Sequence, residues 1–226
     1  MIAYPRLNVK IVATHGGINV GQDGVTHQAV EDIAIMRAIP GMKVVAVADP
    51  GEVISALRSV VAYKGPVYLR LPRAPYEVIH EDEDKVDFQI GKGELLREGK
   101  DLTIFAVGMM VYDSLVAAER LKKDGIEARV VNARTIKPID EEMVIKAAKE
   151  TGAIVTAEDH NRYGGLGSAV AEVLVQNTPV YMEQVALDDE FAHSGDGYEL
   201  LKEFHLDADS IYAKAKAVIA RKKSGE

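Results

Sequence analysis

The stretch Thr14–Gln28, with the sequence THGGINVGQDGVTHQ, decides how this chain is interpreted. It follows the short β-branched run Val9–Ala13 and precedes a helical pattern, which places a glycine-rich loop at the carboxyl end of a buried strand. In open α/β sheets, ligands bind at that end of the strands. The loop carries two imidazoles and a carboxylate, His15, His27 and Asp23, which hydrogen-bond and exchange protons near neutral pH. These groups make a functional loop a candidate interpretation, while a glycine-rich surface turn that carries histidine is the alternative.

The composition limits the classes of protein that the chain can belong to. Its 226 residues, 47% hydrophobic and 27% charged, suit one large or two ordinary globular domains. The net charge of -8, without a basic stripe, argues against nucleic acid or an anionic membrane as a partner. No apolar run approaches the ~20 residues of a membrane span. The absence of cysteine excludes disulfides and thiolate chemistry, predicts a cytoplasmic protein and is compatible with a thermophilic source.

The first part of the chain alternates strand and helix patterns. We predict strands over 10–14, 43–47 and 67–71, and helices over 29–38 and 51–63. The first helix stops before Ile39-Pro40-Gly41, a helix-ending sequence. The second begins with Asp49 as its N-cap and Pro50 at its first position. Strands and helices at this spacing predict parallel βαβ units.

The sequence changes character over residues 77–100. The acidic cluster at 81–85 is typical of a solvated linker, with a docking role as the less favoured interpretation. Three glycines punctuate 88–100 and predict a short hairpin. We therefore place a domain boundary near residue 87.

The second part of the chain repeats the alternation more clearly. We predict strands over 102–107, 128–132, 153–158 and 180–184, and helices over 111–123, 141–150, 168–176 and 209–221. The expected fold class is α/β, with two domains at 1–80 and 88–226. Each domain is expected to be a parallel or mixed sheet flanked by helices.

Several motifs in this order resemble those of transketolase. The pyrimidine-binding domain of that family is matched by Thr14-His15 with Gly21–Gln28, by Arg37–Pro40, by Ala48–Pro50 and by Pro66–Arg73. The transketolase C-terminal domain is matched by Glu158–Asn161 and Gly164–Val170. The chain is similar to the small, C-terminal subunit of split transketolases, whose diphosphate-binding domain is a separate polypeptide. On this resemblance, 1–80 is the C-terminal part of the pyrimidine-binding domain and 88–226 is the transketolase C-terminal domain.

The resemblance implies a reaction and roles for four residues. Transketolases of the pentose phosphate pathway move a two-carbon ketol unit between sugar phosphates, using thiamine diphosphate and a divalent cation, Mg or Ca. His15 and His27 would be catalytic, lining the cleft over the thiazolium ring and hydrogen-bonding the donor's hydroxyls. Asp23 would contact the 2-hydroxyl of the sugar, and Arg73 would hold the sugar phosphate. The implied partners are sugar phosphates, other copies of this chain and a separate N-terminal diphosphate-binding subunit.

The chain also departs from the family pattern. Ahead of the histidine loop, transketolases carry a glutamate that activates the aminopyrimidine and a Phe-rich segment that stacks on it. Neither motif is found, because Glu31, Glu52 and Glu77 lie in the wrong context. The cofactor-binding residues are therefore unassigned, no metal ligand is assigned, and cofactor and cation are expected to be held mainly by residues and a partner chain outside this sequence.

This departure leads to expectations about the isolated chain. We expect it to begin at an internal methionine, part-way through the pyrimidine-binding domain. Alone it should neither bind thiamine diphosphate productively nor be active. The truncation would expose a sheet edge and apolar surface, so we also expect the isolated chain to self-associate. Because the resemblance implies active sites between subunits, we expect dimers, and a heterotetramer with the partner chain in the cell.

Three further motifs each have two interpretations. Gly164–Ser168 before a helix could cradle a phosphate, but close packing is favoured. His160 beside Glu158 and Asp159 could ligate a metal, but a single histidine is thin evidence. The turn His193-Ser194-Gly195 lacks the elbow of a serine nucleophile and is interpreted as structural.

Three alternatives to a split transketolase remain. One is the β subunit of a 2-oxo-acid dehydrogenase, whose loop usually lacks the Asp-Gly-x-Thr-His-Gln run. Another is 1-deoxyxylulose-5-phosphate synthase, against which Gln28 and the Thr14-His15 pair favour transketolase. The last is a non-catalytic dimerisation module that kept the fold.

Overall fold

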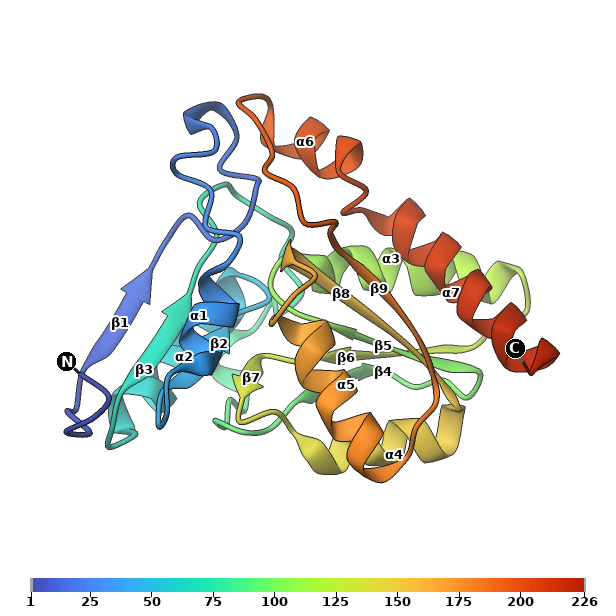
Figure 1. Cartoon of the computed structure of the whole chain (residues 1–226), viewed down its shortest axis with the longest axis horizontal. Coiled ribbons are helices and arrows are strands. Elements are labelled where there is room, and N and C mark those ends of the chain that lie inside the picture. Colours follow the sequence, from blue (N-terminus) through green and yellow to red (C-terminus); the bar gives the residue numbers. More distant parts are fainter. Residues whose placement is uncertain (1, 226) are drawn as a thin grey trace.

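Residues 2–225 are described by a computed structural model in which two sheets lie side by side (Figure 1). The first sheet has the order β1-β3-β2-β7, and its strands are β1 (Lys10–Ala13), β2 (Lys43–Ala46), β3 (Val67–Arg70) and β7 (Thr135–Lys137). The three strands β1, β3 and β2 are parallel, connected through α1 (Asp32–Ala38) and α2 (Pro50–Ala62). The predicted βαβ units are confirmed. Asp49 caps α2 as predicted, because its carboxylate accepts the Glu52 N–H at 3.0 Å.

The second sheet has five strands in the order β4-β6-β5-β8-β9. They are β4 (Glu94–Arg97), β5 (Leu102–Ala106), β6 (Ala128–Asn132), β8 (Ala153–Asn161) and β9 (Tyr181–Leu187), and all but β4 run parallel. Two core clusters fill its faces. One face packs against α3 (Met110–Lys123) and α7 (Ala208–Ser224), and the other against α4 (Glu141–Thr151) and α5 (Leu166–Asn177) (Figure 1). The α/β class is confirmed.

The predicted hairpin over 88–100 is wrong. The strand β4 pairs antiparallel with β6, and not with its sequence neighbour β5. A hairpin does not form over 88–100 because β4 is the strand in that range and its partner, β6, comes from a later part of the chain. Neither β7 nor the short helix α6 (Gly197–Glu203) is predicted from the sequence.

The two parts of the chain share structure. The strand β7 follows β6 in sequence but pairs antiparallel with β2 of the first sheet. Ile18 and Val30, from the glycine-rich loop region, are buried in the same core cluster as residues of α3 and α7. The loop is therefore built on both parts of the chain. Within residues 2–225, none of the helices combines the length and apolar character needed to cross a bilayer.

Candidate functional site

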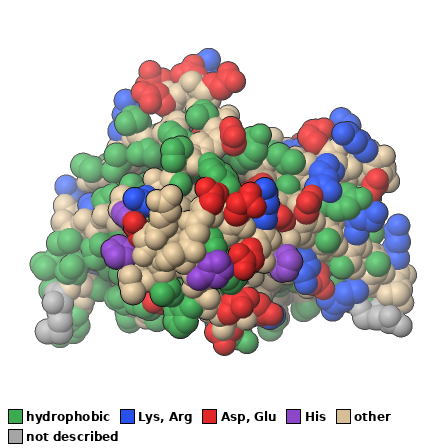
Figure 2. All heavy atoms as spheres, turned by 90° about the horizontal axis from the view of Figure 1, so that it is seen from above, with side chains coloured by type: hydrophobic (Ala, Val, Ile, Leu, Met, Phe, Trp, Pro, Cys, Tyr) green, Lys and Arg blue, Asp and Glu red, His purple; other side chains and the backbone are tan. Residues whose placement is uncertain are grey.

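The four residues singled out from the sequence lie together beyond the carboxyl ends of β1 and β3. The Asp23 carboxylate lies between a guanidinium and an imidazole, 3.4 Å from Nη1 of Arg73 and 3.9 Å from Nε2 of His15. The rings of His15 and His27 are 6.5 Å apart between centroids. Figure 2 views this face of the molecule, where histidine side chains lie among acidic groups. Because all four side chains are at least partly exposed, they can meet a ligand from solvent.

His15 has an unusual backbone conformation. Its φ of 68° lies in the left-handed region, which costs a residue with a Cβ free energy. Hydrogen bonds on both sides hold it there, from Gly16 N–H to the Leu71 carbonyl and from Ala29 N–H to the His15 carbonyl, each 3.1 Å. Strain of this kind persists where the surrounding structure fixes it, and it concentrates at functional sites.

The buried guanidinium of Arg70, at the end of β3, holds this loop in place through hydrogen bonds. Arg70 donates from Nε to Asp32 at 2.9 Å, and from Nη2 to the carbonyls of Ala29 at 3.1 Å and Asp159 at 2.8 Å. A Cβ at Gly16 would come within 2.7 Å of the Arg70 side chain, so the glycine permits this close contact. Burial alone would raise the pKa of Asp32, but the charge of Arg70 and the hydroxyl of Tyr68 hold it below its ordinary value.

Asp159 brings the second part of the chain into the site. Its Oδ1 accepts the Ile18 N–H at 3.0 Å, and a Cβ at Gly17 would overlap its carboxylate. Burial raises the pKa of Asp159 to about 6. Reasoning from the sequence assigned no positioning role to Asp159 or Arg70, since neither residue signals locally that it will be buried beneath the loop.

The neighbouring motif is structural. Glu158 accepts the N–H groups of Leu166 at 2.7 Å and Gly167 at 2.8 Å, so the start of α5 is already bonded to a carboxylate. Burial raises the pKa of Glu158 to about 7. His160 is fully buried, accepting the Ala34 N–H at Nε2 and donating from Nδ1 to the Asn161 carbonyl, and burial lowers its pKa to about 4. Both motifs are thus committed to packing.

The turn at 193–195 lies against the loop. The Gln28 amide donates to the His193 carbonyl at 3.1 Å. The His193 imidazole is 3.0 Å from Glu203, and among the described contacts it does not bond to the Ser194 hydroxyl. The turn therefore contains no serine–histidine pair in the described part of the chain.

An ion network between the two parts of the chain contains the atoms of a possible metal site. Ligand atoms of Glu52, His80 and Glu94 all lie within 4.8 Å of one another. However, His80 bonds through both ring nitrogens, to Asp49 at 2.7 Å and Glu94 at 3.0 Å. Arg134 pairs with Glu52 at 3.2 Å and Glu94 at 3.3 Å. These cations already neutralise the carboxylates, so we interpret the group as an internal ion network.

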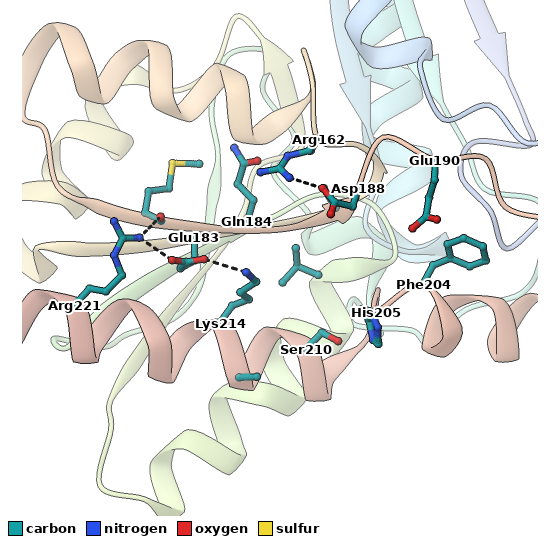
Figure 3. Close-up of a pocket in the computed structure, with 14 residues that line it drawn as sticks. Arg162, Glu183, Gln184, Asp188, Glu190, Phe204, His205, Ser210, Lys214 and Arg221 are labelled. Carbon is teal, nitrogen blue, oxygen red and sulfur yellow. Dashed lines mark hydrogen bonds and ion pairs between the residues drawn. The ribbon is translucent and has the colours of Figure 1, made fainter. Parts of the chain in front are cut away.

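A hollow of about 760 Å³ lies away from the loop, between β9 and α7 (Figure 3). Five of its charged side chains form ion pairs with one another. Glu183 accepts Lys214 at 3.1 Å and Arg221 at 2.7 Å, and Arg162 pairs with Asp188. Because these charges are paired within the hollow, whereas the loop groups two imidazoles, a carboxylate and a guanidinium on one exposed face, the loop remains the better candidate site.

Comparison with known proteins identifies the family. The family model described as "Transketolase, pyrimidine binding domain" matches residues 1–78, and "Transketolase, C-terminal domain" matches residues 91–211. The chain belongs to the transketolase family. The resemblance seen in the sequence is confirmed.

Two relatives and one solved structure extend this result. A Methanocaldococcus jannaschii protein, provisionally described as a transketolase C-terminal section, is 51% identical over 93% of this chain and 66% of its own length. The 6-deoxy-6-sulfo-D-fructose transketolase subunit SqwH of a Clostridium species is 45% identical over 98% of this chain and 68% of its own length. A solved structure described as "Split gene transketolase, inactive beta4 tetramer" is 42% identical, with a TM-score of 0.90 over 97% of this chain and 69% of that one. The chain thus spans about two thirds of the length of these transketolase relatives.

Proposed function

We propose that this chain is the C-terminal section of a split transketolase, which transfers a two-carbon ketol unit between sugar phosphates when assembled with a diphosphate-binding partner. The observation that carries this proposal is the grouping of His15, His27, Asp23 and Arg73 on one exposed face. The relatives named as a transketolase section and a transketolase subunit support it.

Each of the four side chains has a chemical role in the proposal. Arg73 presents a planar guanidinium that suits a sugar phosphate, and the carboxylate of Asp23 holds it in place before the phosphate arrives. Asp23 accepts a hydrogen bond from the 2-hydroxyl of the sugar. His15 and His27, whose imidazoles lie beside each other, hydrogen-bond the donor's hydroxyls and hold or move protons there.

The cofactor of the family is thiamine diphosphate, which supplies the carbanion chemistry when it is bound. The start of α5 does not fit its diphosphate end, and the group Glu52, His80 and Glu94 does not fit the cation. A diphosphate suits free N–H groups at a helix start, but those of α5 are bonded to Glu158. The possible cation ligands Glu52 and Glu94 are neutralised by Arg134 and His80. We therefore propose that the diphosphate and its divalent cation are held mainly by the partner, and we derive no step through them.

The surface around β1 favours assembly. The strand β1 is an edge of its sheet, and its Val12 side chain is 48% exposed. Beside it lies an apolar hollow of about 540 Å³, lined by Ile2, Ala3, Tyr4, Ile11, Met36, Ile39, Pro40 and Met42. Open edges and apolar patches of this kind promote association. We propose that the isolated chain forms homo-oligomers, a behaviour that the tetramer in the description of the solved relative supports.

Reconstitution tests the proposed function. The chain, its diphosphate-binding partner, thiamine diphosphate and Mg²⁺ are mixed with a ketose phosphate and an aldose phosphate, and products are identified by mass. We expect a ketose phosphate two carbons longer than the acceptor, and none when either polypeptide is omitted. No two-carbon transfer by the assembled pair would overturn the proposal. Carbon dioxide release with pyruvate as the donor would instead support a 1-deoxyxylulose-5-phosphate synthase.

A further inference from the structure

The glycine-rich loop rests on a segment from the far end of the chain, residues 192–198, which contains the turn at 193–195 and the start of α6 (Figure 1). The two segments contact each other through their backbones. Gly195 N–H donates to the Gly21 carbonyl at 3.4 Å, and a Cβ at Gly197 would lie 2.6 Å from the Asn19 carbonyl oxygen. A Cβ at Gly24 would meet the Ser194 hydroxyl at 2.3 Å. Glycines thus permit a close approach along the whole contact.

One buried side chain ties the two segments together. The Gln28 amide nitrogen donates to the Ile18 carbonyl at 3.3 Å, within the loop, and to the His193 carbonyl at 3.1 Å, in segment 192–198. Gln28 is only 6% exposed and directly follows His27 in the chain. Fixing Gln28 therefore also fixes the peptide that carries His27.

The polar groups at this contact are not arranged for stability alone. The Gln28 Oε1 atom and both amide atoms of Asn19 are buried without a hydrogen-bond partner among the described residues. Unsatisfied buried polar atoms cost free energy, and each needs an explanation. A methionine at position 28 would fill the same space without that cost, so the glutamine is better explained by the two bonds that order the loop.

We infer that segment 192–198 is a positioning element for His27 and Asp23, and that it acts through Gln28 and through the close contact of Gly197 with Asn19. The inference assigns Gln28 as a positioning residue, because it contacts the backbone of the loop and not the exposed face where the site residues lie. It rests on the proposed function for the catalytic meaning of His27 and Asp23. The ordering of the loop itself can be tested without that function.

The test compares amide hydrogen exchange of residues 18–28 in the full chain and its variants. Gln28→Met keeps the length and burial of the side chain but removes both donated bonds. Gln22→Met, at an exposed position of the same loop, is the matched control. We expect amide exchange of the loop to accelerate about tenfold in Gln28→Met, because the lost hydrogen bonds contribute about 1.4 kcal/mol. The thermal midpoint should stay unchanged, and Gln22→Met should not accelerate the exchange.

A second variant approaches the contact from the other side. Gly197→Ala adds a methyl group that must push the Asn19 carbonyl away, while alanine itself suits the first turn of α6. We expect Gly197→Ala to accelerate amide exchange of residues 18–28 as Gln28→Met does. Because both changes open the same contact, the double variant should accelerate exchange by less than the product of the two single accelerations. Unchanged loop exchange in both single variants would overturn the inference, and Gly197→Ala decides the question if Gln28→Met does not fold.

The catalytic consequence is measured on the chain assembled with its diphosphate-binding partner. We expect kcat to fall about tenfold in Gln28→Met, and the imidazole proton resonances of His27 in the free chain to shift while the thermal midpoint stays constant. If the variants accelerate loop amide exchange but the native assembly transfers no ketol unit, the proposed function is rejected and the ordering of the loop by segment 192–198 is kept. If the native assembly transfers the ketol unit but the variants show unchanged loop exchange and unchanged His27 resonances, the positioning role alone is rejected.

Discussion

Replacement of His80 tests the ion network that joins the two parts of the chain. His80 lies between Asp49 of the first part and Glu94 of the second, and its side chain is 10% exposed. Hydrogen bonds to Asp49 and Glu94 raise the pKa of His80 to about 10 from an ordinary 6.5. The folded chain therefore keeps His80 protonated at neutral pH, and His80→Gln removes that charge.

The size of the effect follows from linkage. One pKa unit is worth about 1.4 kcal/mol, so the shift corresponds to roughly 5 kcal/mol of stability. Because the pKa of His80 is higher in the folded state, this contribution is complete below about pH 6.5 and is lost as the pH rises toward 10. Between about pH 6 and pH 8, it falls by about 2 kcal/mol.

Urea unfolding of the native chain and His80→Gln at both pH values measures this change. Other groups also titrate in the window, so the quantity to compare is the difference between the two proteins. We expect His80→Gln to destabilise the chain by about 2 kcal/mol more at pH 6 than at pH 8. The control is His27→Gln, an exposed imidazole whose described hydrogen bond is to the adjacent Thr26 hydroxyl. An equal destabilisation by His80→Gln at both pH values would refute the assigned charge state.

Three further changes probe the site and its supports. Arg73→Ala should raise the KM for a phosphorylated acceptor about 10- to 100-fold in the assembled enzyme, because a charged hydrogen bond is lost, whereas Arg58→Ala, at a surface ion pair, should leave KM unchanged. Because burial raises the pKa of Glu158 to about 7, its ionisation destabilises the folded chain as the pH rises from about 4.5 to 7. Relative to the native chain, Glu158→Gln should thus gain up to about 3 kcal/mol in unfolding free energy over that range, and urea titrations showing no gain would contradict this. Val12→Lys on the β1 edge should reduce self-association in light scattering, and a native chain that is already monomeric at all concentrations would be the contrary result.

The sequence predicted most of the regular elements, because their hydrophobic residues recur at helix or strand spacing. It missed β7, since three residues are too few for a pattern and Thr135–Lys137 becomes a strand only by pairing with β2. It missed α6 for a related reason, although Asp196 is an N-cap that accepts the N–H groups of Tyr198 and Glu199. The hairpin prediction failed because strand partners are set by the whole sheet, which local glycines do not reveal.

The proximity of the four site residues could also be anticipated, whereas their supports could not. His15, Asp23 and His27 share one loop, and the parallel pairing of β1 with β3 brings Arg73 to the same edge. By contrast, Arg70 meets an aspartate 38 positions away and a carbonyl 89 positions away. Such buried pairs depend on tertiary packing, for which a single sequence carries no periodic signal.

The strained backbone of His15 explains why the site needs both parts of the chain. A left-handed residue with a Cβ returns to an ordinary conformation unless its neighbours are held on every side. Arg70 fixes the loop from β3, Asp159 fixes it from β8, and Gln28 fixes it through the carbonyl of His193. Two of these three attachments come from the second part of the chain. The C-terminal region is therefore a structural component of the candidate site, and weakening its contacts should alter the geometry of His15 before it unfolds the chain.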